Sequence, residues 1–195
     1  MKTLGRFIVV FVAICAFAAW FSNERDAQLA RTTSANLASG QYPGGSPAPI
    51  ARWSYTTDVD PMASGKSHEA RIASTNSFEF SFPYAGKQYA LLFLRNNPKY
   101  GKDVYIRITK GQMICGVSSC SVAVRFDDGA AQNWPASAPK DGDSTFLFLR
   151  NYDSFVKQLA RAKRVRIQPT VYQQGDVMME FQVEGFDPAK YSGKS

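Results

Sequence analysis

The stretch VYIRIT, residues 104–109, alternates apolar and polar side chains with a period of two. Val104, Ile106 and Ile108 fall on one side of an extended chain, and the residues between them fall on the other. This alternation is typical of a β-strand that packs one face against a core. The stretch therefore predicts a strand, and related patterns recur on both sides of it.

Several other segments carry strand signals. Residues 78–82, 122–126 and 177–184 alternate in the same way. Two continuous apolar runs, QYALLFLR (88–95) and STFLFLR (144–150), are typical of strands that are covered on both faces. Short stretches rich in Gly, Pro, Asn and Asp separate these segments and indicate turns. We therefore expect many short strands joined by tight connections.

One segment has a helical pattern instead. In YDSFVKQLARAK (152–163), Phe155, Leu159 and Ala162 lie on one side of a helix. Asp153 is a candidate N-cap because a short polar side chain can accept a hydrogen bond from the first free backbone N–H groups. The segment predicts a single amphipathic helix late in the chain.

The order of these elements defines the expected fold class. The helix is followed by a strand in RVRIQPTVY (164–172), which Pro169 should place at an edge or an end, because proline cannot donate to a strand ladder. We predict a mainly β domain over residues 51–188. Its architecture is an antiparallel β-sandwich or a bent sheet, with one α-helix before the last two strands.

The first 22 residues carry a targeting signal. Lys2 and Arg6 precede an unbroken apolar run over residues 7–21. A basic start followed by a short apolar segment is typical of a secretory signal peptide, and the small residues Ala16 and Ala18 could form a cleavage site. A retained membrane anchor is the alternative, although the run is short for a membrane span. Both interpretations place residues 23–195 on the outer side of the membrane.

The remaining segments follow from composition. Residues 23–50 are rich in Ser, Ala, Gly and Pro and predict a flexible linker, and residues 189–195 predict a flexible tail. The expected location is periplasmic, either anchored in the inner membrane by residues 7–21 or released after signal cleavage. The net charge of +7 favours anionic partners. Export argues against nucleic acid as one of them.

Two cysteines remain for the exported domain, because Cys15 lies in the apolar leader. Cys115 and Cys120 flank a four-residue loop between two strand-like segments, 112–115 and 120–126. An even pair in an oxidising compartment indicates a disulfide, and residues opposed across a hairpin lie within disulfide range. A labile redox disulfide and a metal site are the alternatives. The spacing favours a structural disulfide, since redox motifs usually have two intervening residues and no further zinc ligands are spaced nearby.

A basic stripe is the candidate binding surface. It lies along the predicted helix and its exit, and it contains Lys157, Arg161, Lys163, Arg164 and Arg166. Such a stripe opposite an apolar face could contact anionic lipid, cell wall or an acidic partner. The alternative is a solvated helix face with no partner.

The acidic residues are candidates for glycosidase chemistry or calcium binding, but turn chemistry is the favoured interpretation. They form three pairs in turn-like contexts, where aspartate favours local backbone hydrogen bonds: Asp58 and Asp60, Asp127 and Asp128, Asp141 and Asp143. His68 is the one histidine of the chain, which excludes most His-dependent metal and triad schemes. Arg125 and Asp127 are expected to form a structural ion pair on one strand. We expect no catalytic residues, no metal and no cofactor.

From Trp53 onward the chain resembles a known family. The segments WSYTTDVDPMASGKS, YALLFLRNN, VAVRFDDGAAQNWPAS and MEFQVEGF occur in the order seen in exported accessory proteins associated with type VI secretion, the TagO-like (VasI-like) family. The resemblance covers residues 53–187, and Asn96 stands where that family often has a cysteine. The resemblance implies a β domain of the bacterial envelope that makes protein–protein contacts, as an accessory of a secretion system. The alternative function is a module that binds the cell wall or inhibits a wall hydrolase.

Overall fold

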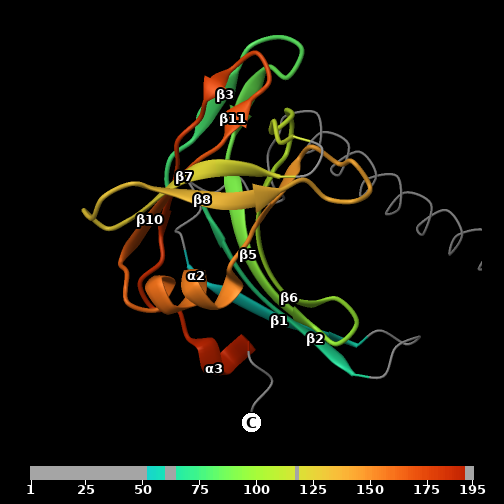
Figure 1. The fold of residues 1–195 in the computed structure, drawn as a ribbon, viewed down its shortest axis with the longest axis vertical. Helices are drawn as coiled ribbons and strands as arrows, with labels where there is room; N and C mark the ends of the chain where they lie inside the picture. Colours follow the sequence, from blue (N-terminus) through green and yellow to red (C-terminus); the bar gives the residue numbers. More distant parts are fainter. Residues whose placement is uncertain (1–51, 60–64, 117–118, 192–195) are drawn as a thin grey trace, which may run out of the picture. The chain divides into compact units, whose positions relative to one another are not determined.

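The computed structural model describes residues 52–59, 65–116 and 119–191 (Figure 1). Their main element is one nine-stranded antiparallel sheet with the order β1-β2-β5-β6-β9-β8-β7-β10-β13. Its strands are β1 (Ser54–Val59), β2 (Lys66–Ala73), β5 (Ala90–Asn97), β6 (Gly101–Ile108), β7 (Cys120–Phe126), β8 (Gln132–Ser137), β9 (Phe146–Leu149), β10 (Arg164–Gln168) and β13 (Met179–Gln182).

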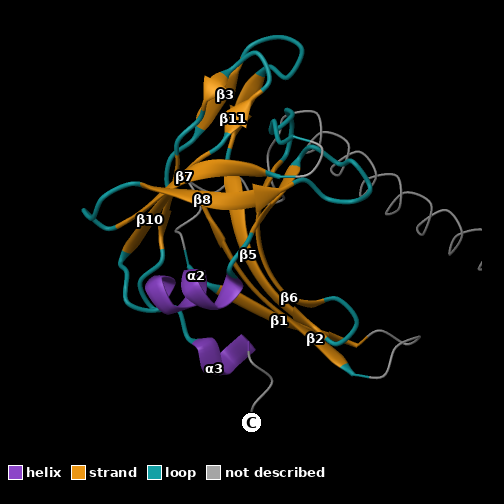
Figure 2. Ribbon diagram, in the orientation of Figure 1, coloured by secondary structure: helices purple, strands orange, loops and turns teal. Residues whose placement is uncertain are grey.

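Two small hairpins and two short helices complete the domain (Figure 2). One hairpin pairs β3 (Phe78–Phe80) with β4 (Gly86–Gln88), and the other pairs β11 (Thr170–Val171) with β12 (Gly175–Asp176). The helices are α2 (Tyr152–Leu159) and α3 (Pro188–Tyr191). The mainly β class is therefore confirmed, with a short helix before the last strands.

The sheet is strongly bent. In Figure 1, β7 and β8 cross the direction of the long strands β5 and β6. The two ends of the sheet also approach each other, because the backbone N–H of Thr75, just after β2, donates to the Glu180 carbonyl of β13 at 2.7 Å. The Trp53 indole N–H donates to the Val183 carbonyl at 3.0 Å. Of the two expected architectures, the bent sheet is the one that forms.

The decisive stretch 104–109 forms most of β6. Val104, Ile106 and Ile108 are buried in the core as expected. Its second face is not simply exposed, however, because Tyr105 is also buried and stacks on Phe93 with ring centroids 4.8 Å apart. Aromatic rings from neighbouring strands thus cover part of the face that alternation alone assigned to water.

The helix forms, but its N-cap is not the expected one. Asn151 occupies the cap in a left-handed conformation with φ of 57°, and Asp153 lies inside the first turn. Asparagine tolerates this conformation better than most residues. Phe155 and Leu159 are fully buried, and Ala162 is buried beyond the helix end. The predicted apolar side is therefore confirmed.

Two expected strands differ in the structure. Residues 112–115 do not form a strand, and Met113 instead makes an isolated bridge with Val171. Residues 164–172 divide at Pro169 into β10 and β11. Because β10 lies between β7 and β13, the proline marks a strand end and not an edge.

The expected tail is wrong for its first residues. Residues 189–191 belong to α3, and Tyr191 is buried with only 3% exposed, against Phe186. The expected leader and linker, residues 1–50, lie outside the described residues. Within the described part, no helix is long and apolar enough to span a membrane.

Candidate functional site

The two cysteines form the predicted disulfide. The alpha-carbons of Cys115 and Cys120 are 5.2 Å apart, and both side chains pack against the core. The expected hairpin geometry is wrong, because β7 pairs with β8 and β10 and not with the segment before the loop. Ile114 instead donates its N–H to the Thr170 carbonyl at 2.8 Å. The disulfide therefore ties that segment to the start of β7.

The basic stripe is divided between two kinds of surroundings. Lys157 lies exposed on α2, and Arg161 and Lys163 lie exposed in the turn that follows. Arg164 and Arg166 belong to β10 and are only partly exposed. The helix ends at residue 159, so the spacing does not produce one continuous helical face.

Arg164 and Arg166 already have acidic partners. The Arg164 Nη2 atom lies 2.8 Å from an Asp128 oxygen, and the Arg166 Nε atom lies 2.8 Å from Glu180 Oε2. Asp127 Oδ1 accepts the backbone N–H groups of Lys163 and Arg164, each at 2.9 Å. These contacts fix the turn between α2 and β10. They also neutralise the two guanidinium groups, which are then less available to bind an anionic ligand.

The expected Arg125–Asp127 ion pair does not form. The Arg125 guanidinium donates to the Asp128 backbone carbonyl at 3.2 Å, while the Asp127 carboxylate faces the start of β10. Asp127 adopts a positive φ of 48°, which turns its side chain away from the strand direction. The local turn therefore determines the partners of both residues.

The pair Asp141 and Asp143 also serves a turn, whereas Asp58 lies in β1 and not in the expected turn. Asp143 Oδ1 accepts from the Thr145 hydroxyl at 2.6 Å and from its N–H at 2.9 Å, and the hydroxyl above all lowers the pKa of Asp143. Asp60 lies outside the described residues. His68 lies 3.1 Å from the Thr57 hydroxyl across β1 and β2. Among the residues that the structure describes, no three His, Cys, Asp or Glu side chains lie close enough to hold a metal.

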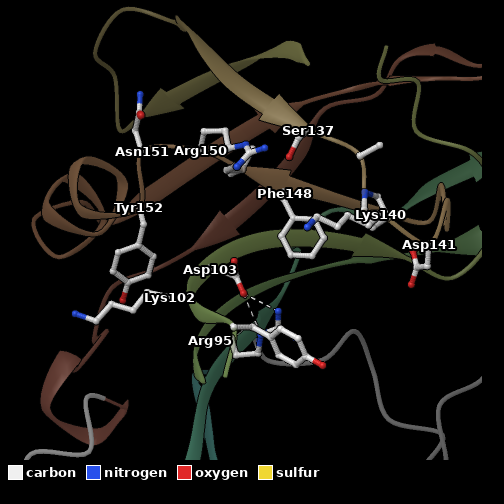
Figure 3. A pocket seen from close by; sticks show the side chains of 14 residues that line it. Arg95, Lys102, Asp103, Ser137, Lys140, Asp141, Phe148, Arg150, Asn151 and Tyr152 are labelled. Carbon is white, nitrogen blue, oxygen red and sulfur yellow. Dashed lines mark hydrogen bonds and ion pairs between the residues drawn. The ribbon is translucent and has the colours of Figure 1, made fainter. Parts of the chain in front are cut away.

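A cleft of about 670 Å³ is the feature that sequence reasoning missed (Figure 3). Three parts of the chain build it: the β5–β6 hairpin, the loop after β8, and the connection from β9 into α2. Its lining residues are Arg95, Tyr100, Lys102, Asp103, Ser137, Ala138, Pro139, Lys140, Asp141, Phe148, Leu149, Arg150, Asn151 and Tyr152. Four of these side chains are cationic and two are carboxylates.

One wall of the cleft is a half-buried ion pair. The Arg95 Nη2 atom lies 2.6 Å from Asp103 Oδ2, and the two side chains are 28% and 24% exposed. The Arg95 guanidinium also lies 5.5 Å from the Tyr105 ring centroid and 5.8 Å from that of Tyr100. The charges of this pair balance each other, so Arg95 holds the wall together more than it attracts a ligand.

Three other cations line the cleft without an acidic partner. Within the described residues, no carboxylate lies at ion-pair distance from Lys102, Lys140 or Arg150. The Arg150 backbone is held on both sides, since its N–H donates to the Pro135 carbonyl at 2.8 Å and its carbonyl accepts the Trp134 indole N–H at 2.6 Å. Its guanidinium is thus an exposed charge on a fixed backbone.

Neutral polar groups lie between these cations. The Lys102 ammonium lies 5.7 Å from the Tyr152 ring centroid, and burial raises the pKa of Tyr152 to about 12. Its hydroxyl is therefore protonated at neutral pH and able to donate. Ser137, 7% exposed, and Asn151 add a hydroxyl and an amide to the lining. The cleft can bind anionic groups and hydrogen-bonding neutral groups at once.

The cleft could not be predicted from the sequence, because each segment that contributes to it has the pattern of an ordinary turn. The stretches NNPKYGK and APKDGD have the composition of turns, and they come together because β5, β6, β9 and β8 are neighbours in the sheet. The lysines of the two stretches, Lys99 and Lys102 in the first and Lys140 in the second, were the one available sign. Comparison with protein-family models, with curated proteins and with solved structures finds no match to this chain.

Proposed function

We propose that this chain is an exported binding protein of the bacterial envelope and that it holds an anionic ligand in the cleft described above. It acts by binding and not by catalysis. The signal-like residues 1–22 support a periplasmic location, with the domain either anchored in the inner membrane or released. The observation that carries the proposal is a group of three cations around one concave surface, Lys102, Lys140 and Arg150, for which the described part of the chain supplies no ion-pair partner.

The physical argument concerns where positive charge is still available. Cations that already contact carboxylates, such as Arg164 and Arg166, gain little from a further anion. Exposed cations on a concave surface add their fields, and they attract an anion more strongly than the same charges on a flat face. The net charge of +7 acts in the same direction at longer range.

Cosedimentation of the full chain with purified peptidoglycan tests this function. We expect wild-type protein to sediment with the wall, and Lys140→Glu combined with Arg150→Glu to abolish most of the binding. The matched control is Lys157→Glu combined with Arg161→Glu, which makes the same charge change on α2 and its exit. Equal loss in both variants would indicate net charge alone. Loss only in the control would place the contact on α2.

A second candidate function is protein–protein contact through the two small hairpins. They lie side by side in Figure 1, and the Ser81 N–H donates to the Gln174 side chain at 3.1 Å. Phe82 is 86% exposed at the tip of the first hairpin, and Tyr172 is exposed on the second. Exposed aromatic side chains are enriched at protein interfaces. The resemblance to type VI accessory proteins implies this kind of contact.

A crosslinking experiment in the native host tests the second candidate. Phe82→Ser should remove a crosslinked protein partner that wild-type chain captures, while Lys140→Glu with Arg150→Glu should retain it. If the hairpin variant captures the same partner as wild type, the hairpins are not its contact.

A further inference from the structure

We infer that the ligand of the cleft is a segment of acidic glycan, that is, a sugar chain carrying carboxylate groups. This inference rests on the proposed function, because it names the chemistry of the anion that the cleft would bind. The evidence is the joint presence of separated cations, neutral hydrogen-bonding groups and aromatic rings in one concave surface.

The positions of the cations favour a polymer over a single anion. In Figure 3, Lys102 lies beside Tyr152 at one end of the cleft, whereas Lys140 lies near Phe148 at the other. Arg150 lies between them, on the opposite wall from the Arg95–Asp103 pair. In that view the three cationic side chains do not converge on one point, which favours a ligand with several anionic groups over one small anion. A chain with repeated negative groups can place one group near each cation.

The neutral groups distinguish a glycan from an acidic peptide. Sugar hydroxyls both donate and accept, and they find matching partners in the Ser137 hydroxyl, the Asn151 amide and the Tyr152 hydroxyl. An acidic peptide would need partners for its backbone amides instead, as in strand addition to a free sheet edge. The cleft lies over β6, β8 and β9, which are interior strands of the sheet. It therefore does not offer a free edge.

The aromatic residues extend this match. Tyr100 is 63% exposed at the rim, and the Tyr152 and Phe148 rings line the cleft. Aromatic rings bury apolar area and, for tyrosine, keep a polar end in water. Sugar rings present apolar C–H faces between their hydroxyls and suit such surfaces. The cleft volume of about 670 Å³ is adequate for a short oligosaccharide segment.

Titration calorimetry on the full chain tests the inference with three probes of equal length: oligogalacturonate, its methyl ester, and oligoglutamate. We expect oligogalacturonate to bind and the other two to bind at least about tenfold more weakly. Equal binding of oligoglutamate and oligogalacturonate would overturn the glycan assignment and leave an anion-binding cleft. If the methyl ester binds as tightly as the acid, both the acidic-glycan assignment and the anion-binding function of the cleft are overturned. If none of the three probes binds, the glycan inference is overturned. The cosedimentation with peptidoglycan then tests the proposed function separately.

Two variants separate the charged from the neutral contacts. Arg150→Gln should weaken oligogalacturonate and any residual oligoglutamate binding alike, by roughly five- to tenfold. Tyr152→Phe removes one hydroxyl and should weaken oligogalacturonate alone, by roughly threefold. Lys157→Gln, outside the cleft, is the control and should bind as wild type does. If Tyr152→Phe and wild type bind oligogalacturonate equally while both unfold at the same temperature, the neutral contact is disproved.

Discussion

Arg166 on β10 lies directly opposite Glu180 on β13, and 2.8 Å separates the guanidinium Nε from the carboxylate Oε2. Both side chains are mostly covered, at 20% and 23% exposure. The pair joins the last strand of the sheet to its neighbour. Arg166, which the sequence analysis assigned to the basic stripe, therefore stabilises the sheet through this pair.

Replacing Arg166 by Gln should destabilise the domain by about 1–2 kcal/mol. The change leaves Glu180 partly buried without its charged hydrogen-bond partner, and such contacts are worth more than exposed ion pairs. Urea denaturation followed by tryptophan fluorescence measures the effect. Lys157→Gln serves as the control, because that lysine is exposed on α2. Equal stability of the two variants would show that the pair contributes nothing.

The disulfide should stabilise the domain by about 2 kcal/mol, since it closes a ring between residues only 5 apart. Replacing both Cys115 and Cys120 by Ser should lower the urea midpoint accordingly. Trypsin should release both cysteines in one peptide, residues 111–125, because no lysine or arginine lies between them. In protein isolated from cells this peptide should be lighter by two hydrogen atoms before reduction than after it. An unchanged mass would contradict both the pairing and the oxidising location.

Phe155→Ala should be the most damaging single change on α2. The ring is fully buried and packs edge-on against Trp134 and Phe126, with centroids 5.5 Å and 5.4 Å away. Truncating a buried phenylalanine typically costs about 3–5 kcal/mol. The matched control is Phe82→Ala, the same chemical change at a side chain that is 86% exposed. Similar melting temperatures for the two variants would mean that α2 does not depend on this packing.

The sequence predicted the strands well because their periodicity reports burial directly. Val104, Ile106 and Ile108 are core residues in the structure, as alternation required. Prediction from the sequence failed where pairing between residues far apart in the chain determines the secondary structure. Nothing local in residues 112–115 shows that Met113 bridges Val171.

The candidate site shows the same limit more strongly. Spacing grouped Lys157 with Arg164 as one stripe along the helix and its exit, but Arg164 on β10 is paired with Asp128. The cations that do gather, Lys102 and Arg150, come from segments far apart in the chain. The pairing of β6 with β9, with Val104 opposite Leu149, brings them to one surface, and no local pattern encodes that long-range pairing.

Alkaline pH should destabilise the domain through two tyrosines. Burial raises the pKa of Tyr152 from 10.0 to about 12, and burial together with the Glu69 carboxylate raises that of Tyr105 further. The folded state therefore keeps protons that the unfolded state loses above pH 10, so stability is full below that pH and falls as pH rises towards 12. For Tyr152 we expect a loss of about 1 kcal/mol, discounted because the ring is partly exposed.

Urea denaturation between neutral pH and pH 12 measures this loss, and the ultraviolet absorbance of tyrosinate gives the titration itself. Tyr152→Phe should flatten the alkaline part of the stability curve, because the substituted ring has no proton to lose. Tyr100→Phe is the control, since Tyr100 is exposed and should leave the slope as in wild type. A Tyr152→Phe curve that falls as steeply as the wild-type curve would show that this hydroxyl titrates alike in both states.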